Sequence, residues 1–223
     1  RRPSAPSSLA ASTARSRPSS FAHPAAGSRC YARIRDAASG TGSVASSGMG
    51  EIVEFASNGG TATGYLAAPE GGTGIPLVVI QEWWGLVPHI TDVCDRFAAE
   101  GFVALAPDLF HGESTTEPDE AGKLMMALNV DQAARDMSGA VDKVAEVAGS
   151  DRVGVTGFCM GGGLALVVAT RRPDKVKAVV PWYGLIPWPN AEPDWSQLDA
   201  KVLGHYAEND GMFNPAKVAN CTC

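Results

Sequence analysis

The feature that most constrains the fold of this chain is an alternation of two patterns between residues 75 and 208. Short runs rich in apolar and β-branched residues, typical of strands buried on both faces, alternate with segments that have the composition of helices. The strand-like runs are IPLVVIQE (75–82), FVALAPD (102–108), RVGVTGF (152–158), KAVVPWYG (177–184) and KVLGHYAE (201–208). The alternation predicts an α/β fold, with a mainly parallel sheet that right-handed crossovers cover with helices on both faces.

Local signals predict the elements that precede and connect these runs. EIVEF and ATGYLAAP flank the turn signal SNGG, which indicates a β-hairpin after residue 50. A helix is expected in HITDVCDRFAAEG, with Thr91 or Asp92 as its N-cap and Gly101 as its end. A longer helix is expected over 131–149, where four apolar residues form one stripe: Ala134, Met137, Val141 and Val144.

Length and charge limit the class of protein. The 223 residues, 45% of them hydrophobic, are enough for one domain with a substantial core. The first 48 residues carry seven arginines and one acidic residue, whereas the rest carries 11 basic and 23 acidic residues. An acidic body of this kind argues against nucleic acid or an anionic membrane as partner. No apolar run reaches the ~18–20 residues of a membrane helix, so no spanning segment is expected.

The first 48 residues differ from residues 49–223, which form the predicted domain. They are rich in Ser, Ala and Arg, without apolar periodicity, and are expected to be a disordered leader. This composition suits an organelle transit peptide, but Met49 could also be the start, with a flexible tail or translated upstream sequence before it. Five scattered cysteines argue against a secreted disulfide framework, and no spacing predicts a metal site. The expected location is the cytoplasm or an organelle (chloroplast or mitochondrion), and not outside the cell.

The octapeptide TGFCMGGG points to chemistry at Cys159. It has the pattern glycine, any residue, nucleophile, any residue, glycine, between a predicted strand and a predicted helix. A strand-to-helix turn this sharp requires residues without a side chain, here Gly157 and Gly161, on both sides of the nucleophile. The helix N-terminus is expected to favour the thiolate of Cys159. The alternative is a glycine-rich turn with a structural thiol.

Several stretches together resemble the dienelactone hydrolase family of the α/β-hydrolase fold. They are QEWWGLVPHITDVCDRFAAEGFVALAPDLFHGE (81–113), GFCMGGG (157–163), VVPWYG (179–184) and GHYAENDGMFNP (204–215). The resemblance implies that Cys159 is the nucleophile, that Asp210 orients a catalytic histidine, and that Glu82 pairs with the resting thiol. It also implies that the backbone N–H groups of Trp83 and Met160 form the oxyanion hole, and that no cofactor is required.

The residues themselves support two of these roles. Glu82 follows an apolar strand, where a carboxylate is costly without a partner. Asp210 lies in a turn directly after a predicted strand, where functional carboxylates of such sheets gather, although a plain surface turn is the alternative.

The resemblance also implies a catalytic histidine some tens of residues after the acid, whereas the sequence ends 13 residues after Asp210. The last strand and helix of the family's fold are therefore expected to be missing, as in a truncated member, which leaves KVLGHYAE as an exposed apolar edge. Among the histidines that the sequence does contain, His205 lies within a strand-like run. His89 and His111 are the better candidates to replace the expected catalytic histidine.

The substrate is expected to be small and largely apolar. The segment 111–123 contains no arginine and one lysine, Lys123, among four acids, which disfavours an anionic lactone. An aromatic pocket is predicted, although its residues could equally belong to the core: Trp84, Phe110, Trp182 and Tyr183. The sequence thus predicts a hydrolase of a small ester or lactone, or alternatively a non-catalytic protein that binds a ligand in the same pocket. It predicts no oligomeric state.

Overall fold

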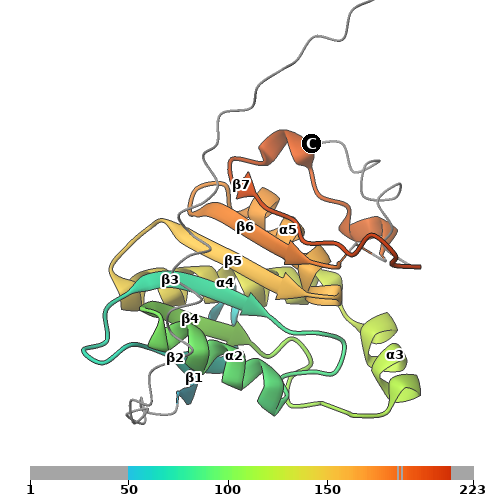
Figure 1. The fold of residues 1–223 in the computed structure, drawn as a ribbon, viewed down its shortest axis with the longest axis horizontal. Helices are drawn as coiled ribbons and strands as arrows, with labels where there is room; N and C mark the ends of the chain where they lie inside the picture. Colours follow the sequence, from blue (N-terminus) through green and yellow to red (C-terminus); the bar gives the residue numbers. More distant parts are fainter. Residues whose placement is uncertain (1–49, 185, 187, 212–223) are drawn as a thin grey trace, which may run out of the picture. The chain divides into compact units, whose positions relative to one another are not determined.

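The computed structural model describes residues 50–184, 186 and 188–211, and the predicted leader lies outside these residues. The described chain forms a seven-stranded sheet in the order β1-β2-β4-β3-β5-β6-β7 (Figure 1). The strands are β1 (Glu51–Ser57), β2 (Gly60–Ala67), β3 (Ile75–Ile80), β4 (Phe102–Pro107), β5 (Val153–Phe158), β6 (Val176–Trp182) and β7 (Lys201–Val202). β1 and β2 form the predicted antiparallel hairpin, and β4, β3, β5, β6 and β7 run parallel. The α/β prediction is confirmed.

Helices cover the two faces of the sheet unequally (Figure 1). The helices are α2 (Pro88–Ala99), α3 (Pro118–Ala127), α4 (Val130–Ala148) and α5 (Met160–Arg171), with short 3-10 turns at Pro189–Ala191 and Trp195–Gln197. Side chains alternate along a strand, so Val78 and Ile80 of β3 pack with α4 and α5, while Leu77 and Val79 pack with α2 on the other face. None of the helices in residues 50–211 is long and apolar enough to cross a membrane.

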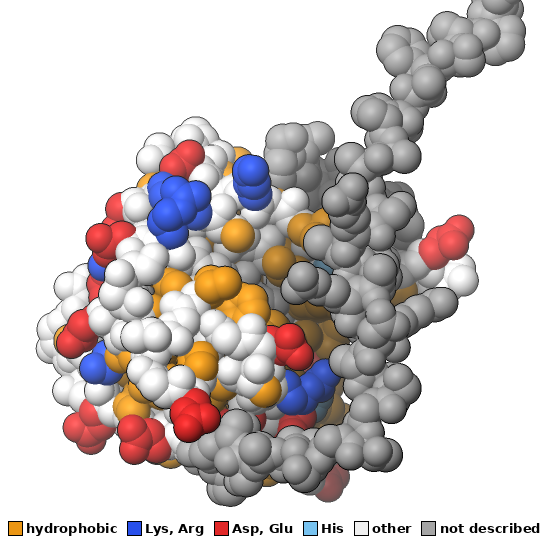
Figure 2. Space-filling model, turned by 60° about the vertical axis from the view of Figure 1, so that its left-hand side comes forward, with side chains coloured by type: hydrophobic (Ala, Val, Ile, Leu, Met, Phe, Trp, Pro, Cys, Tyr) orange, Lys and Arg blue, Asp and Glu red, His pale blue; other side chains and the backbone are white. Residues whose placement is uncertain are grey.

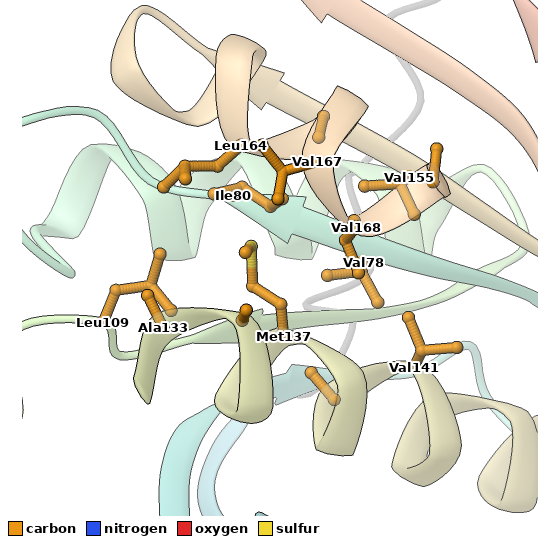
Figure 3. Close-up of a cluster of buried hydrophobic side chains, with 14 of the residues drawn as sticks. Val78, Ile80, Leu109, Ala133, Met137, Val141, Val155, Leu164, Val167 and Val168 are labelled. Atoms are coloured by element: carbon orange, nitrogen blue, oxygen red, sulfur yellow. The ribbon is translucent and has the colours of Figure 1, made fainter. Parts of the chain in front are cut away.

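The larger core lies between the sheet and helices α4 and α5 (Figure 3). Met137 projects from α4 toward Ile80 and Leu164, and its side chain is 0% exposed. The stripe predicted for α4 is confirmed, because Ala134, Met137 and the two valines that follow at helical spacing are all buried. This core fixes α5, and therefore the residue that begins it, against the sheet.

One helix prediction was wrong in its boundary. α2 begins at Pro88 with Val87 as its N-cap and no capping side chain, rather than at Thr91 or Asp92. Proline suits the first helical position, because its fixed φ matches the helix and it has no N–H group to leave unsatisfied. Helix α3, which begins at Pro118, was not predicted from the sequence.

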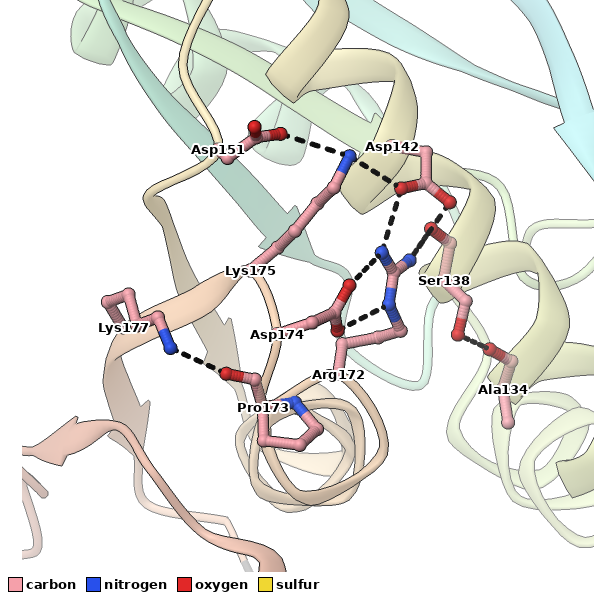
Figure 4. A network of polar contacts seen from close by, with 9 residues as sticks. All are labelled: Ala134, Ser138, Asp142, Asp151, Arg172, Pro173, Asp174, Lys175 and Lys177. Atoms are coloured by element: carbon pink, nitrogen blue, oxygen red, sulfur yellow. Dashed lines mark hydrogen bonds and ion pairs between the residues drawn. The ribbon is translucent and has the colours of Figure 1, made fainter.

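An ion-pair network connects the end of α5 with α4 (Figure 4). The guanidinium of Arg172 donates to both Asp142 and Asp174, and to the backbone carbonyl of Ser138. Hydrogen bonds from Arg172 hold the pKa values of Asp142 and Asp174 below their usual range. The network holds the C-terminal end of α5, opposite the end that carries Cys159.

The predicted strand 201–208 is shorter than expected. β7 contains only Lys201 and Val202, and one further bridge pairs His205 with Trp182 of β6. Val202 and Leu203 are 40% and 62% exposed at this edge of the sheet.

Candidate active site

The elbow, which is the turn from β5 to α5 at residues 157–161, forces Cys159 into an unusual backbone conformation. Cys159 has φ 54° and ψ −120°, which places it among the few non-glycine residues with positive φ in residues 50–211. A Cβ on Gly157 would lie 2.1 Å from the carbonyl oxygen of Gly161, and one on Gly161 would lie 2.4 Å from the carbonyl of Gln81. The two glycines are therefore required for the turn, as the sequence predicted, and the residue between them is strained.

Two further glycines in the turn were missed at the sequence level. A Cβ on Gly184, just after β6, would lie 2.1 Å from the carbonyl oxygen of Cys159, and one on Gly162 would lie 2.8 Å from the carbonyl of Trp182. The N–H of Cys159 donates to that same Trp182 carbonyl at 3.0 Å. The signals were present in the GGG run and in the YG pair, but the contact itself depends on how β5 and β6 align.

Glu82 and Tyr183 meet at the end of the sheet. Glu82 lies two residues beyond the end of β3, and Tyr183 directly follows β6 with φ 40°. The hydroxyl of Tyr183 donates to Oε1 of Glu82 at 3.2 Å. Burial and the charge of Glu82 raise the pKa of Tyr183 to about 12, so the phenol stays protonated and donates at neutral pH. The predicted need of Glu82 for a partner is met by Tyr183.

The loop that carries Asp210 follows the last strand. Its backbone is tied to β6, because Tyr183 donates to the carbonyl of His205 at 2.8 Å and His205 donates to the carbonyl of Pro181 at 2.9 Å. The hydroxyl of Tyr206 donates to the carbonyl of Gly184 at 3.0 Å. Asp210 is half-buried, and its charge acts on the thiol of Cys159.

The thiol of Cys159 is held in its protonated form. Its pKa is raised, mainly by burial and further by the negative charges of Glu82 and Asp210. The N–H of Met160 at the start of α5 acts in the opposite direction but does not outweigh burial. The expectation that the helix N-terminus favours the thiolate holds in direction, because the N–H of Met160 lowers the pKa, but desolvation and the two carboxylates outweigh this contribution in the resting site.

The three histidines in the described residues occupy different environments. The ring of His205 stacks on Trp182, with ring centroids 4.0 Å apart. Nε2 of His111 lies 3.3 Å from the carboxylate of Asp136, a buried residue of α4. His89 is exposed in the first turn of α2 and lines a cavity together with Tyr183.

The predicted aromatic pocket divides into separate parts. Trp182 and Tyr183 line a cavity of about 530 Å³ beside α2, together with Phe158 and Phe97. Phe110 is buried in the core and lines a different cavity of about 270 Å³, so the core alternative holds for this residue. Trp84 packs edge to face against Trp83 with ring centroids 5.0 Å apart. Figure 2 shows apolar side chains reaching the surface among charged ones on one side of the molecule.

Cys159, Glu82, Tyr183 and Asp210 thus gather at the carboxyl ends of β3, β5, β6 and β7. Within residues 50–211, no group of three or more His, Cys, Asp or Glu side chains is placed to hold a metal ion. The site contains a strained cysteine at a helix N-terminus, and the negative charges of two carboxylates, Glu82 and Asp210, act on its thiol. That arrangement has the elements of nucleophilic catalysis.

The sheet order, the crossovers and the elbow after β5 define an α/β-hydrolase fold. The sequence profile of the dienelactone hydrolase family matches residues 62–222, and the chain belongs to that family.

Relatives agree with this assignment. The chain is 43% identical over 184 residues to "Protein usf" of Aquifex pyrophilus, covering 76% of each chain. It is 40% identical over 183 residues, again covering 76% of each chain, to a protein of Aquifex aeolicus (strain VF5) named as a candidate carboxymethylenebutenolidase. The crystal structure of a candidate dienelactone hydrolase from Klebsiella pneumoniae superposes with a TM-score of 0.65 at 28% identity, covering 77% of this chain and 78% of that one.

Proposed function

We propose that this member of the hydrolase family cleaves a small carboxylic ester or lactone by nucleophilic attack of Cys159. The observation that carries the proposal is the position of Cys159, in a strained turn at the N-terminus of α5, facing the carboxylates of Glu82 and Asp210. A structural thiol has no need of positive φ or of two charged neighbours that disfavour its ionisation.

In the first step, Glu82 accepts the proton of the Cys159 thiol, and the sulfur attacks the carbonyl carbon of the substrate. The backbone N–H groups of Trp83 and Met160 are proposed to stabilise the oxyanion. Collapse of the tetrahedral intermediate breaks the carbon–oxygen bond of the ester and leaves a thioester on Cys159. The departing alkoxide takes the proton back from Glu82, so this step needs no cofactor.

In the second step, water hydrolyses the thioester, releases the acid and restores the thiol. Asp210 is proposed to orient the base that activates this water. Each of the three described histidines has another environment: His205 stacks on Trp182, His111 lies beside Asp136, and His89 is exposed to solvent. Because the histidines lie in these environments, we expect deacylation to be slower than acylation.

The substrate is proposed to be neutral near the scissile bond. Trp182, Tyr183 and Phe158 offer an aromatic wall beside the site. An anionic lactone would face the charges of Glu82 and Asp210.

A burst experiment tests the proposal. With 4-nitrophenyl acetate, we expect release of one equivalent of nitrophenol per chain, followed by a slower steady phase. Cys159→Ala should abolish the burst, and Asp210→Asn should preserve the burst while slowing the steady phase. Cys94→Ala is the matched control, because Cys94 is a buried thiol on the inner face of α2 and its replacement should leave both phases unchanged.

The alternative is a binding protein without turnover, which the raised pKa of Cys159 favours. A burst that survives in Cys159→Ala would show that another residue is acylated and would contradict the role of Cys159. No acylation with any neutral ester would contradict the hydrolase and support the alternative. Equilibrium binding of the same esters to the unreactive chain would then identify the ligand.

The proposed place of action is the cytoplasm or an organelle, because the scattered cysteines do not suit a secreted framework. A fluorescent protein fused to residues 1–48 tests the two. Entry into an organelle would support the transit-peptide hypothesis, and a diffuse signal would contradict it.

A further inference from the structure

The hydrogen bond from Tyr183 to Glu82 crosses the end of the sheet at the elbow. In the sheet, Ile80 of β3 pairs with Gly157 of β5, and Gly157 pairs with Pro181 of β6. Two residues beyond each of these three lie Glu82, Cys159 and Tyr183. The order β3-β5-β6 therefore places Cys159 between the other two, and the bond from Tyr183 to Glu82 spans it.

We propose that Tyr183 is a positioning residue of this site: its hydroxyl holds the Glu82 carboxylate beside Cys159 and so sets the negative charge that the sulfur faces. The inference deepens the proposed function and rests on the proposed role of Cys159 as nucleophile. Glu82 is half-buried on a loop, and the bond to Tyr183 opposes its rotation into solvent.

The backbone around Tyr183 is built to hold this side chain in place. Tyr183 has φ 40°, a conformation that costs free energy in a residue with a side chain. Its N–H donates to the carbonyl of His205, the preceding residue accepts from the N–H of Cys159, and Gly184 packs against the carbonyl of Cys159. The phenol is thus fixed to the same turn as the thiol whose environment it controls.

The ionisable groups near the thiol come from four parts of the chain. Glu82, Asp210 and Tyr183 interact electrostatically with Cys159. Three residues of or next to α2 line the cavity that Tyr183 also lines: His89, Arg96 and Glu100. Of the carboxylates, only Glu82 is reached by the Tyr183 hydroxyl in the hydrogen bonds of the described chain.

The test is the rate of Cys159 alkylation by iodoacetamide between pH 6 and 10, in the full chain with Cys30, Cys221 and Cys223 replaced by Ser. Cys94 stays silent, because it is 0% exposed and burial raises its pKa to about 12. Mass spectrometry of the labelled peptide assigns the reaction to Cys159. The assay needs no turnover, so a failure of the ester hydrolysis and a failure of this inference are distinguishable.

With Tyr183→Phe, we expect the alkylation rate at pH 7.5 to rise about three- to tenfold, because a carboxylate released toward water opposes the thiolate less. Glu82→Gln should raise the rate further, and its effect should shrink in the Tyr183→Phe background, since the two changes act through one group. The matched control is Tyr65→Phe, which removes the bond from Tyr65 to Asp95 at 2.9 Å beneath α2 and should leave the rate unchanged.

Three results would overturn the inference. The first is a rate in Tyr183→Phe equal to that of the parent while Glu82→Gln raises it. The second is a slower rate in Tyr183→Phe, which would mean that Tyr183 holds the carboxylate away from the sulfur. The third is an additive effect of the two substitutions in the double variant.

Discussion

A single methyl group added at Gly184 should disrupt the site more than the fold. In Gly184→Ala the new Cβ would lie 2.1 Å from the carbonyl oxygen of Cys159 and 2.7 Å from the amide nitrogen of Gly163. Both neighbours are backbone atoms of the elbow, so no flexible side chain can move aside. Relief requires about 1 Å of displacement between the end of β6 and the start of α5, since carbon–oxygen contacts need more than about 3 Å.

The magnitude follows from what must move. Overpacking of a tight contact costs about 1–3 kcal/mol of unfolding free energy, which in a domain of this size lowers Tm by about 2–4 °C for each kcal/mol. A shift of about 1 Å at a nucleophile costs on the order of 100-fold in rate. We therefore expect a folded variant whose acylation burst is slowed by about 100-fold.

The assay pairs thermal unfolding, followed by circular dichroism, with the 4-nitrophenyl acetate burst. Gly122→Ala is the matched control, because a Cβ there meets nothing closer than a Trp83 ring atom at 4.0 Å. Gly122 lies inside helix α3, so alanine should stabilise it by about 0.5–1 kcal/mol and leave the burst unchanged. A Gly184→Ala variant with the parent's Tm and burst rate would refute the close packing described for the elbow.

Three further predictions concern the scaffold. Met137→Ala removes a side chain that is 0% exposed, and urea denaturation should show a loss of about 2–5 kcal/mol; a loss below about 1 kcal/mol would contradict the packing of Figure 3. Asn129→Ala removes the side chain that caps α4 by accepting a backbone N–H, and should cost about 1 kcal/mol in the same assay. Arg172→Met should cost about 1 kcal/mol at pH 7, because Asp142 and Asp174 are more than half exposed and their ion pairs are screened. The pKa values of both carboxyls are lowered on folding, so the difference between Arg172→Met and the parent should persist above pH ~4 and vanish as the pH falls below it; a difference unchanged at pH 2 would contradict the ion pairs.

The sheet could be predicted from the sequence because its central strands are buried on both faces. β3, β4 and β5 are short apolar runs that end at a turn or a helix, and their length is too small for a buried helix. Helix α3 was missed because Ala121 is its only buried residue, so it has almost no apolar stripe. Its signals were Pro118 at the first position and acidic residues in the first turn. Both stabilise a helix N-terminus, but neither produces a periodic pattern of apolar residues.

The elbow could be predicted, but the contacts around it could not. Gly157, Cys159 and Gly161 lie within five residues, and their spacing between a predicted strand and a predicted helix indicates the turn. The bond between Tyr183 and Glu82 joins residues 101 positions apart, and it depends on the order and register of three strands. The net ionisation of Cys159 could not be predicted for the same reason, since burial and two distant carboxylates outweigh the effect of the local helix N-terminus.

The shortness of β7 has a consequence for the timing of events at the site. Two exposed residues and a few backbone bonds, such as the 3.0 Å bond from Leu203 to Val179, hold the segment that leads to Asp210. Such an edge opens at a small fraction of the free energy of global unfolding. The amide of Leu203 should therefore exchange with deuterium long before those of β3 and β5. We therefore expect the segment that carries Asp210 to detach and return while Cys159, held by the central strands, stays in place.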